Sequence, residues 1–167
     1  VIGFEEKAAA HRGTGVLHRA FSIFLFNDHG EVLLQQRSSL KPLWPEYWSN
    51  TCCSHPRRGE SLTQATQRRL KEELILASQL TFLFKFQYHA IFNDIGSEYE
   101  LCSVFVGNVT DRPEPEFNPT EIAATAWVSV DTVDEWLNDD NVQTTPWFAM
   151  EWQRIKDECS GQMPLSA

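Results

Sequence analysis

The sequence predicts an α/β fold of the α+β kind, in which helices flank a mixed β-sheet in one domain spanning residues 1–167. Two observations lead to this prediction. First, strand-like segments lie on both sides of an amphipathic helical segment, and two more helical segments follow. Second, the 167 residues are 42% hydrophobic and 22% charged, a globular composition in a chain long enough to bury a core without disulfides.

Residues 19–37 have the pattern of a β-hairpin. Apolar residues occupy odd and even positions of the first strand alike, with Phe21, Ile23 and Leu25 on one face. Both faces of this strand are therefore expected to be buried. Residues 27–30 read Asn-Asp-His-Gly and supply the turn.

Residues 61–76 have the periodicity of an amphipathic helix. Ser61 or Thr63 is the expected N-cap, because a hydroxyl at this place accepts a hydrogen bond from the first turn. The apolar residues that recur near helical spacing are Leu62, Ala65, Leu70 and Leu74.

The remaining elements follow in chain order. Residues 82–92 and 97–109 are strand-like, and residues 114–137 give a loop, a strand and a short helix. A last helix covers residues 144–159, because a threonine suited to the N-cap precedes Pro146 at the first helical position.

Charge and cysteine content limit the function classes. A formal net charge of -9 argues against non-specific nucleic-acid binding, which requires a basic surface. There is no signal-peptide pattern and no apolar run of about 18 residues, so no membrane partner is expected. The four cysteines include the neighbours Cys52 and Cys53, which rarely bridge each other. A reducing cytoplasm is therefore the expected location.

A motif over residues 54–76 extends into the predicted helix. It resembles the Nudix box, G-x5-E-x7-R-E-U-x-E-E-x-G-U, in which U is a bulky aliphatic residue. The positions that fit are Glu60, Arg68, Leu70, Glu72, Glu73 and Leu76. The positions that depart are Ser54, Arg69 and Ile75, which stand in place of Gly, Glu and Gly.

The departure at Arg69 bears on the chemistry. In the hydrolase pattern, clustered glutamates hold several Mg²⁺ ions that activate a water against a diphosphate. Arg69 removes one ligand and adds a positive charge, so multi-metal hydrolysis is expected to be impaired. Glu73, four residues later on the same helical face, still allows one Mg²⁺ and contact with a phosphate. The alternative is an ordinary surface helix with ion pairs Arg68–Glu72 and Arg69–Glu73.

A second set of candidate residues is spread along the chain. Glu98 and Glu100 are two apart in a strand, so both carboxylates face the same side, and Cys53 and His55 have the same spacing. With His11 and His18 they offer three imidazoles and two carboxylates, which suit a divalent transition metal or Mg²⁺ better than Ca²⁺. The alternatives are surface or core histidines, solvated glutamates, or a structural zinc site that uses Cys52 or Cys53 with the histidines.

Five segments carry a further resemblance. They read EKAAAHRGTGVLHRAFS, LLQQRSSLKPLWPEYWSNTCCSHPRRGES, RRLKEEL, YELCSVF and TPWFAMEW. From about Glu6 to about Trp152 the chain resembles the type 1 isopentenyl-diphosphate isomerases, which have a Nudix-like fold but do not hydrolyse their substrate. The most specific pieces are W-x3-W followed by N-x-x-C-x-H-P, then E-x-E, then T-P-W.

The resemblance implies an isomerase of isoprenoid biosynthesis. It would interconvert isopentenyl and dimethylallyl diphosphate by protonation and deprotonation through a tertiary carbocation. The resemblance places Cys53 and Glu100 on opposite faces of the alkene, with Tyr88 assisting the carboxyl group and Trp147 facing the cation. The implied partner is a small-molecule diphosphate, with no organic cofactor. Taken alone, Trp147 would be a core anchor at a helix start.

The resemblance also implies two metal sites and a diphosphate subsite. A divalent ion such as Mn²⁺, Zn²⁺ or Mg²⁺ would bind His11, His18, His55, Glu98 and Glu100, and Cys53 is also counted among the candidate ligands. A Mg²⁺ on Glu73 would bridge the diphosphate oxygens. The residues that match the family's basic contacts are Lys7, Arg37, Lys41 and Arg69. Taken alone, Lys7 and Lys41 would be solvated surface residues.

Two other functions fit part of the pattern. A Nudix-type diphosphate hydrolase would release phosphate without moving a double bond, and the departures at Arg69 and Ile75 argue against it. A non-catalytic metal-binding module on the same fold would take up metal without turnover.

Overall fold

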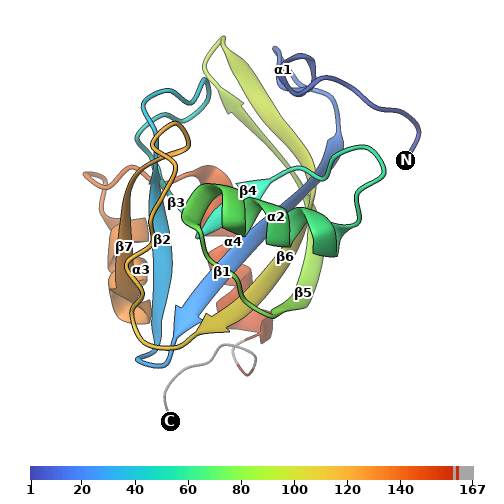
Figure 1. Cartoon of the computed structure of the whole chain (residues 1–167). Coiled ribbons are helices and arrows are strands. Elements are labelled where there is room, and N and C mark those ends of the chain that lie inside the picture. Colours follow the sequence, from blue (N-terminus) through green and yellow to red (C-terminus); the bar gives the residue numbers. More distant parts are fainter. Residues whose placement is uncertain (160, 162–167) are drawn as a thin grey trace.

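A seven-stranded mixed sheet forms the centre of the computed structural model, which describes residues 1–159 and 161 (Figure 1). Its main path runs through β3 (Trp48–Ser49), β2 (Glu31–Arg37), β1 (His18–Asn27), β6 (Gly96–Val109) and β5 (Leu80–Phe92). Off this path, β4 (Cys52–Ser54) pairs with β1, and β7 (Ile122–Ser129) pairs with β2. The pair β1–β6 is parallel and the other pairs are antiparallel, so the predicted mixed sheet is confirmed.

The hairpin predicted for residues 19–37 forms only near its turn. Oδ1 of Asn27 accepts hydrogen bonds from the backbone N–H groups of His29 at 3.0 Å and Glu31 at 2.9 Å. Beyond the pair Phe26–Val32 the two strands separate, since β1 pairs with β4 and β6 while β2 pairs with β3 and β7. The turn is set locally, whereas the strand partners come from distant parts of the chain.

Helix α2 (Leu62–Leu74) occupies the predicted segment. Its N-cap is Ser61, whose hydroxyl accepts from the backbone N–H of Gln64 while the Gln64 side chain bonds back to Ser61, a complete capping box. The helix ends at Ile75, which has the left-handed backbone conformation with φ 53°. The Nudix pattern has Gly here, because Gly adopts this conformation without steric cost.

The other helices are α1 (Lys7–Ala10), α3 (Val130–Asn138) and α4 (Pro146–Cys159). Helices α3 and α4 confirm the predictions for residues 114–137 and 144–159. The sequence did not indicate α1, β3 or β4, which have four, two and three residues. In the part of the chain that the structure describes, no helix is long and apolar enough to cross a membrane.

The core has two parts because both faces of β1 are covered (Figure 1). Phe21, Ile23 and Leu25 pack in the cluster that contains Leu70 and Leu74 of α2. The alternate residues of β1 pack on the opposite side with α4, in the cluster that contains Phe24, Phe26, Phe148 and Trp152. Each buried side chain of this size contributes about 1.5–3 kcal/mol.

Candidate active site

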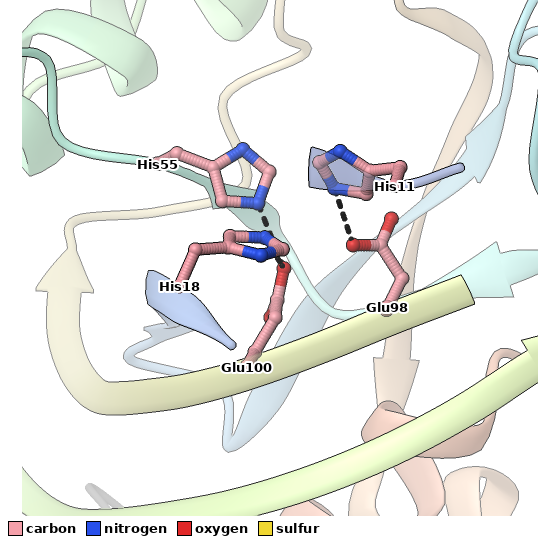
Figure 2. Close-up of side chains that lie close together, drawn as sticks. All are labelled: His11, His18, His55, Glu98 and Glu100. Atoms are coloured by element: carbon pink, nitrogen blue, oxygen red, sulfur yellow. Dashed lines mark hydrogen bonds and ion pairs between the residues drawn. The ribbon is translucent and has the colours of Figure 1, made fainter. Parts of the chain in front are cut away.

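Five side chains from four elements or loops converge at one end of the sheet (Figure 2). One ligand atom from each lies within 4.8 Å of all the others, and the residues are His11, His18, His55, Glu98 and Glu100. The three imidazole rings stand around the two carboxylates, with ring centroids 4.7–5.0 Å apart. The two glutamates share one face of β6, as their spacing predicted.

The imidazoles are oriented by backbone carbonyls. Nδ1 of His11 contacts the Lys7 carbonyl, and Nδ1 of His18 lies 2.6 Å from the Val16 carbonyl. A proton on each Nδ1 completes these hydrogen bonds and leaves Nε2 with a free lone pair directed into the group. Metal-binding histidines are held in this way in proteins.

Three buried atoms of the group have no hydrogen-bond partner among the described residues. They are Nε2 of His11, Nε2 of His18 and Oε2 of Glu98. Nε2 of His11 lies at the ion-pair distance of 2.7 Å from Oε2 of Glu98, but their geometry does not meet that of a hydrogen bond (Figure 2). Buried polar atoms are rarely left unsatisfied. Their convergence without bonding one another fits a divalent metal with nitrogen and oxygen ligands.

Glu100 joins this group to a tyrosine. Its Oε1 lies 2.8 Å from Nε2 of His55 and 3.5 Å from Nε2 of His18, while its Oε2 accepts a 2.7 Å hydrogen bond from the Tyr88 hydroxyl. Burial would raise the pKa of Glu100, but these three partners hold it well below its usual value. Burial, together with the charges of Glu100 and Glu98, raises the pKa of Tyr88. The two carboxyl oxygens of Glu100 therefore have different partners, the histidines for Oε1 and Tyr88 for Oε2.

Cys53 and Glu100 line the same cavity, which has a volume of about 630 Å³. Tyr88, His55 and Trp147 line it too. Burial raises the pKa of Cys53 to about 12, so the thiol holds its proton at neutral pH. Cys53 is not one of the five converging ligands.

Cys52 points away from this cavity. It is fully buried and packs in the cluster on the α2 side, whereas Cys53 packs against the opposite cluster. The two thiols differ in their surroundings because adjacent residues of a strand face opposite sides.

A close backbone approach brings His11 to the site. The His11 carbonyl accepts a 2.9 Å hydrogen bond from the Ser97 N–H, and Arg12 bridges to Gly96. A Cβ atom on Gly96 would clash with the His11 carbonyl oxygen. Gly96 therefore lets the N-terminal segment lie against β6 and deliver His11.

Trp147 forms an aromatic wall of the cavity. It is buried at the start of α4, with its ring 6.2 Å from the Tyr88 ring. The guanidinium of Arg37 lies over the Trp147 ring, 5.3 Å from its centroid, and donates to the backbone carbonyls of Trp44 at 2.9 Å and Leu43 at 2.8 Å. Arg37 is thus fixed at the cavity wall by the loop that precedes β3.

The candidate diphosphate contacts fall into two layers. Lys7, Arg37 and Lys41 line the cavity. Arg69 and Glu73 of α2 do not line it, although both belong to the described chain. Arg69 contacts Glu73 and lies 3.1 Å from Glu72, so the ion pairs of the surface-helix alternative are present, including Arg68–Glu72 at 3.0 Å.

The sequence did not predict a role for two glutamates that are buried or partly buried in the structure. Glu121 lines the cavity and contacts both Lys41 and Arg69. Glu151 of α4 is fully buried, and its Oε1 accepts from the Cys102 thiol at 3.5 Å. Burial raises the pKa of Glu151 to about 8. Glu121 lies outside the quoted segments, and Glu151 lies in the segment TPWFAMEW but outside its specific T-P-W piece, so no spacing rule marked either residue.

Known proteins similar to this chain agree with the fold and show its family. The NUDIX domain model matches residues 16–148. Isopentenyl-diphosphate Delta-isomerase 1 of Photorhabdus laumondii is 44% identical over 92% of this chain and 88% of its own length. The isopentenyl-diphosphate Delta-isomerase of Halorhodospira halophila is 40% identical over 96% and 93%.

Solved structures support the fold independently. The crystal structure of DR0079 from Deinococcus radiodurans superposes with a TM-score of 0.71 at 20% identity, covering 90% of this chain and 89% of that one. Such a likeness concerns the fold alone, whereas the identity to the isomerases extends over nearly the whole sequence. The chain belongs to the isopentenyl-diphosphate Delta-isomerase family of NUDIX-domain proteins.

Proposed function

We propose that this protein interconverts isopentenyl diphosphate and dimethylallyl diphosphate in isoprenoid biosynthesis. The observation that carries the proposal is one cavity lined by a thiol, Cys53, and a carboxyl group, Glu100, which belongs to the three-histidine, two-glutamate group. Moving a double bond requires one proton to arrive at the terminal carbon and another to leave the carbon two positions away. Two proton-transfer groups in one cavity supply that pair of steps.

Glu100 with Tyr88 and Cys53 are the proposed proton-transfer groups. An unactivated alkene is a very weak base, so its proton donor must be held in contact and shielded from water. The 2.7 Å hydrogen bond from Tyr88 fixes Oε2 of Glu100 in the cavity wall. Cys53 and Glu100 each carry one of the two proton transfers, from opposite faces of the alkene. Positioned acid or base groups each contribute on the order of 10²–10⁴ in rate.

The ligand group is proposed to hold a divalent metal, with Mn²⁺, Zn²⁺ and Mg²⁺ as candidates for the three histidines and two glutamates. When bound, the metal would fix Glu100 and tune its affinity for a proton. Oε2 of Glu100 would stay with Tyr88 and the cavity, because Oε1 faces the histidines. One residue would then serve both metal binding and proton transfer.

Trp147 is proposed to stabilise the tertiary carbocation formed between the two proton transfers. Its ring is buried at the cavity wall beside Tyr88. An aromatic face stabilises a desolvated cation by about 2 kcal/mol or more. Water would capture the cation before the second proton transfer. The buried ring therefore also protects the cation by excluding solvent.

The diphosphate is proposed to bind at the basic side of the cavity. Lys7, Arg37 and Lys41 line this side, and Arg69 lies behind it. Burial and the nearby Lys41 lower the pKa of Lys7, as expected where cations are gathered for an anion. Glu73 would hold a Mg²⁺, which would neutralise negative charge on the diphosphate. A strongly acidic protein thus binds an anion through local positive charge.

Incubation with isopentenyl diphosphate and Mg²⁺ in D₂O, followed by NMR, tests the proposal. We expect dimethylallyl diphosphate with deuterium in the newly formed methyl group and an intact diphosphate in the ³¹P spectrum. Release of phosphate without movement of the double bond would identify a hydrolase instead. Metal uptake with no product would identify a non-catalytic metal-binding module.

A further inference from the structure

Glu121 bridges two of the cations assigned to the diphosphate. Its Oε2 forms a short ion pair with Nζ of Lys41, and its Oε1 lies 3.1 Å from Nη2 of Arg69. The two cations come from different elements, the loop after β2 and helix α2. Burial would raise the pKa of Glu121, but Lys41 and Arg69 lower it to about 2, so the side chain is an anion.

The backbone holds Glu121 in this place from both sides. Its N–H donates to the Asn118 carbonyl at 2.9 Å, and its carbonyl accepts from the Ser38 N–H at 3.0 Å. The Asn118 N–H in turn donates to the Glu73 carbonyl at 2.9 Å, which ties this loop to the end of α2. The carboxylate is therefore attached to a fixed backbone, and only its side-chain torsions are free to move it.

Glu121 also separates the cavity from the second layer of the subsite. Glu121 and Lys41 line the cavity, whereas Arg69 and Glu73 do not. Arg69 gives Nη1 to Glu72 and Nη2 to Glu73 and Glu121. Its Nε is buried without a hydrogen-bond partner within the described residues. A diphosphate that contacts Arg69 from the cavity would therefore compete with the Glu121 carboxylate for Nη2 of Arg69.

We propose that Glu121 is an internal anion that occupies the diphosphate subsite of the free protein and is exchanged for the substrate's diphosphate on binding. That the incoming anion is a diphosphate rests on the proposed function. A carboxylate presents two oxygens to Lys41 and Arg69, as one phosphoryl group does. The diphosphate carries more negative charge, so it displaces the carboxylate although the carboxylate is tethered in place.

If Glu121 competes with the bound anion, removing its charge should raise the protein's affinity for pyrophosphate. While Glu121 competes for Lys41 and Arg69, an anion must break both ion pairs to bind. Replacement by Gln keeps the size of the side chain and removes the competing charge. Pyrophosphate should therefore bind tighter to the Glu121→Gln variant, with a Kd lower by about fivefold, or ~1 kcal/mol. A residue that merely braced the two cations would give the opposite result, because its loss would leave them disordered.

Isothermal titration calorimetry with inorganic pyrophosphate tests this on the full chain. The matched control is Glu116→Gln, which removes one negative charge from an exposed side chain of the same loop. It is expected to leave Kd within about twofold, since water and salt screen an exposed charge. Unchanged or weaker binding by Glu121→Gln would overturn the proposal, as would equal tightening by the control.

A second variant keeps the test decisive if Glu121→Gln folds poorly. Glu121→Asp retains the charge on a side chain one methylene shorter, so the contact is weakened and Kd should fall between those of the wild type and the Gln variant. Weaker binding than wild type by the Asp variant contradicts the exchange. Because pyrophosphate binding needs no turnover, a protein that passes these tests but forms no dimethylallyl diphosphate would disprove the proposed function and not the anion exchange.

Discussion

The Tyr88 hydroxyl donates a 2.7 Å hydrogen bond to one carboxyl oxygen of Glu100, and the other oxygen of that carboxyl faces the histidines. The two oxygens of the Glu100 carboxyl group therefore have different partners, and we expect them to serve proton transfer and metal binding separately. The oxygen toward Tyr88 is bonded to a residue that lines the cavity, and the oxygen toward His55 lies next to two histidines of the ligand group. Substitutions on each side should therefore affect turnover and metal binding separately.

Tyr88→Phe is expected to lower kcat by roughly 10²-fold without loss of bound metal, because the ring still fills its place while the donor to Glu100 is gone. Steady-state kinetics and metal analysis of the purified variant measure both quantities. Tyr99→Phe is the control, since Tyr99 lies on the opposite face of β6 and contacts Gln87 at 3.2 Å. Equal loss in both variants would contradict a role for the Tyr88 hydroxyl.

Cys53→Ala is expected to remove nearly all isomerisation, on the order of 10²–10⁴ in rate, while the fold and metal content remain. The thiol lines the cavity but lies outside the five-residue ligand group. Cys52→Ala should instead lower thermal stability, because it opens a void in the α2-side core, and keep turnover per folded molecule. Near-wild-type turnover by Cys53→Ala would defeat the assignment.

Gly96→Ala is expected to weaken metal binding by about 10- to 100-fold, the range seen when the support of a metal ligand is lost. The added methyl group would clash with the His11 carbonyl oxygen and push His11 away from the other ligands. Metal titration of the apo-protein gives the affinity. Gly3→Ala, with nothing within 4 Å of the new methyl, should behave as wild type.

Ile75→Gly is expected to raise the free energy of unfolding by about 1 kcal/mol, because a β-branched residue in the left-handed conformation is strained. The Ile75 side chain is 63% exposed, so little packing is lost with it. Denaturant unfolding measures the change. Ile75→Ala keeps a Cβ in the same conformation and should gain much less. Equal stabilisation by both would point to the exposed side chain and not to backbone strain.

Glu151→Gln is expected to stabilise the protein increasingly as pH rises from about 5 to 8. Burial raises the pKa of Glu151 to about 8 in the folded state, so between these values the unfolded chain releases this proton and the folded chain keeps it. Stability of the wild type therefore falls across this window and levels off above it. At about 1.4 kcal/mol per pKa unit, the full difference is on the order of 4 kcal/mol at pH 8.

Thermal unfolding of both proteins at several pH values measures this difference. Glu158→Gln on the same helix is the control, because Glu158 is exposed and its ion pair with Arg154 lies at the surface. The control difference should stay constant over the same window. A constant difference for Glu151→Gln would show that this carboxyl group ionises normally in the folded protein.

Local pattern determined the elements that are long and regular. The helical periodicity and Ser61 predicted α2, and Pro146 predicted the start of α4. The strand-like segments 82–92 and 97–109 predicted β5 and β6. These signals suffice because hydrogen bonds within a helix or a hairpin join residues close in sequence. Spacing also placed Glu98 and Glu100 on one face, since that depends on a single strand.

Tertiary structure alone decided which strands pair and how the site is completed. The ten-residue parallel pairing of β1 with β6 joins segments some 80 residues apart, and the same separation divides Lys41 from Glu121. Gly96 delivers His11 to this point through backbone contact. Sequence determined the residue types that metal and proton chemistry require. Their meeting in one cavity depends on packing energies of the whole chain, which no local window contains.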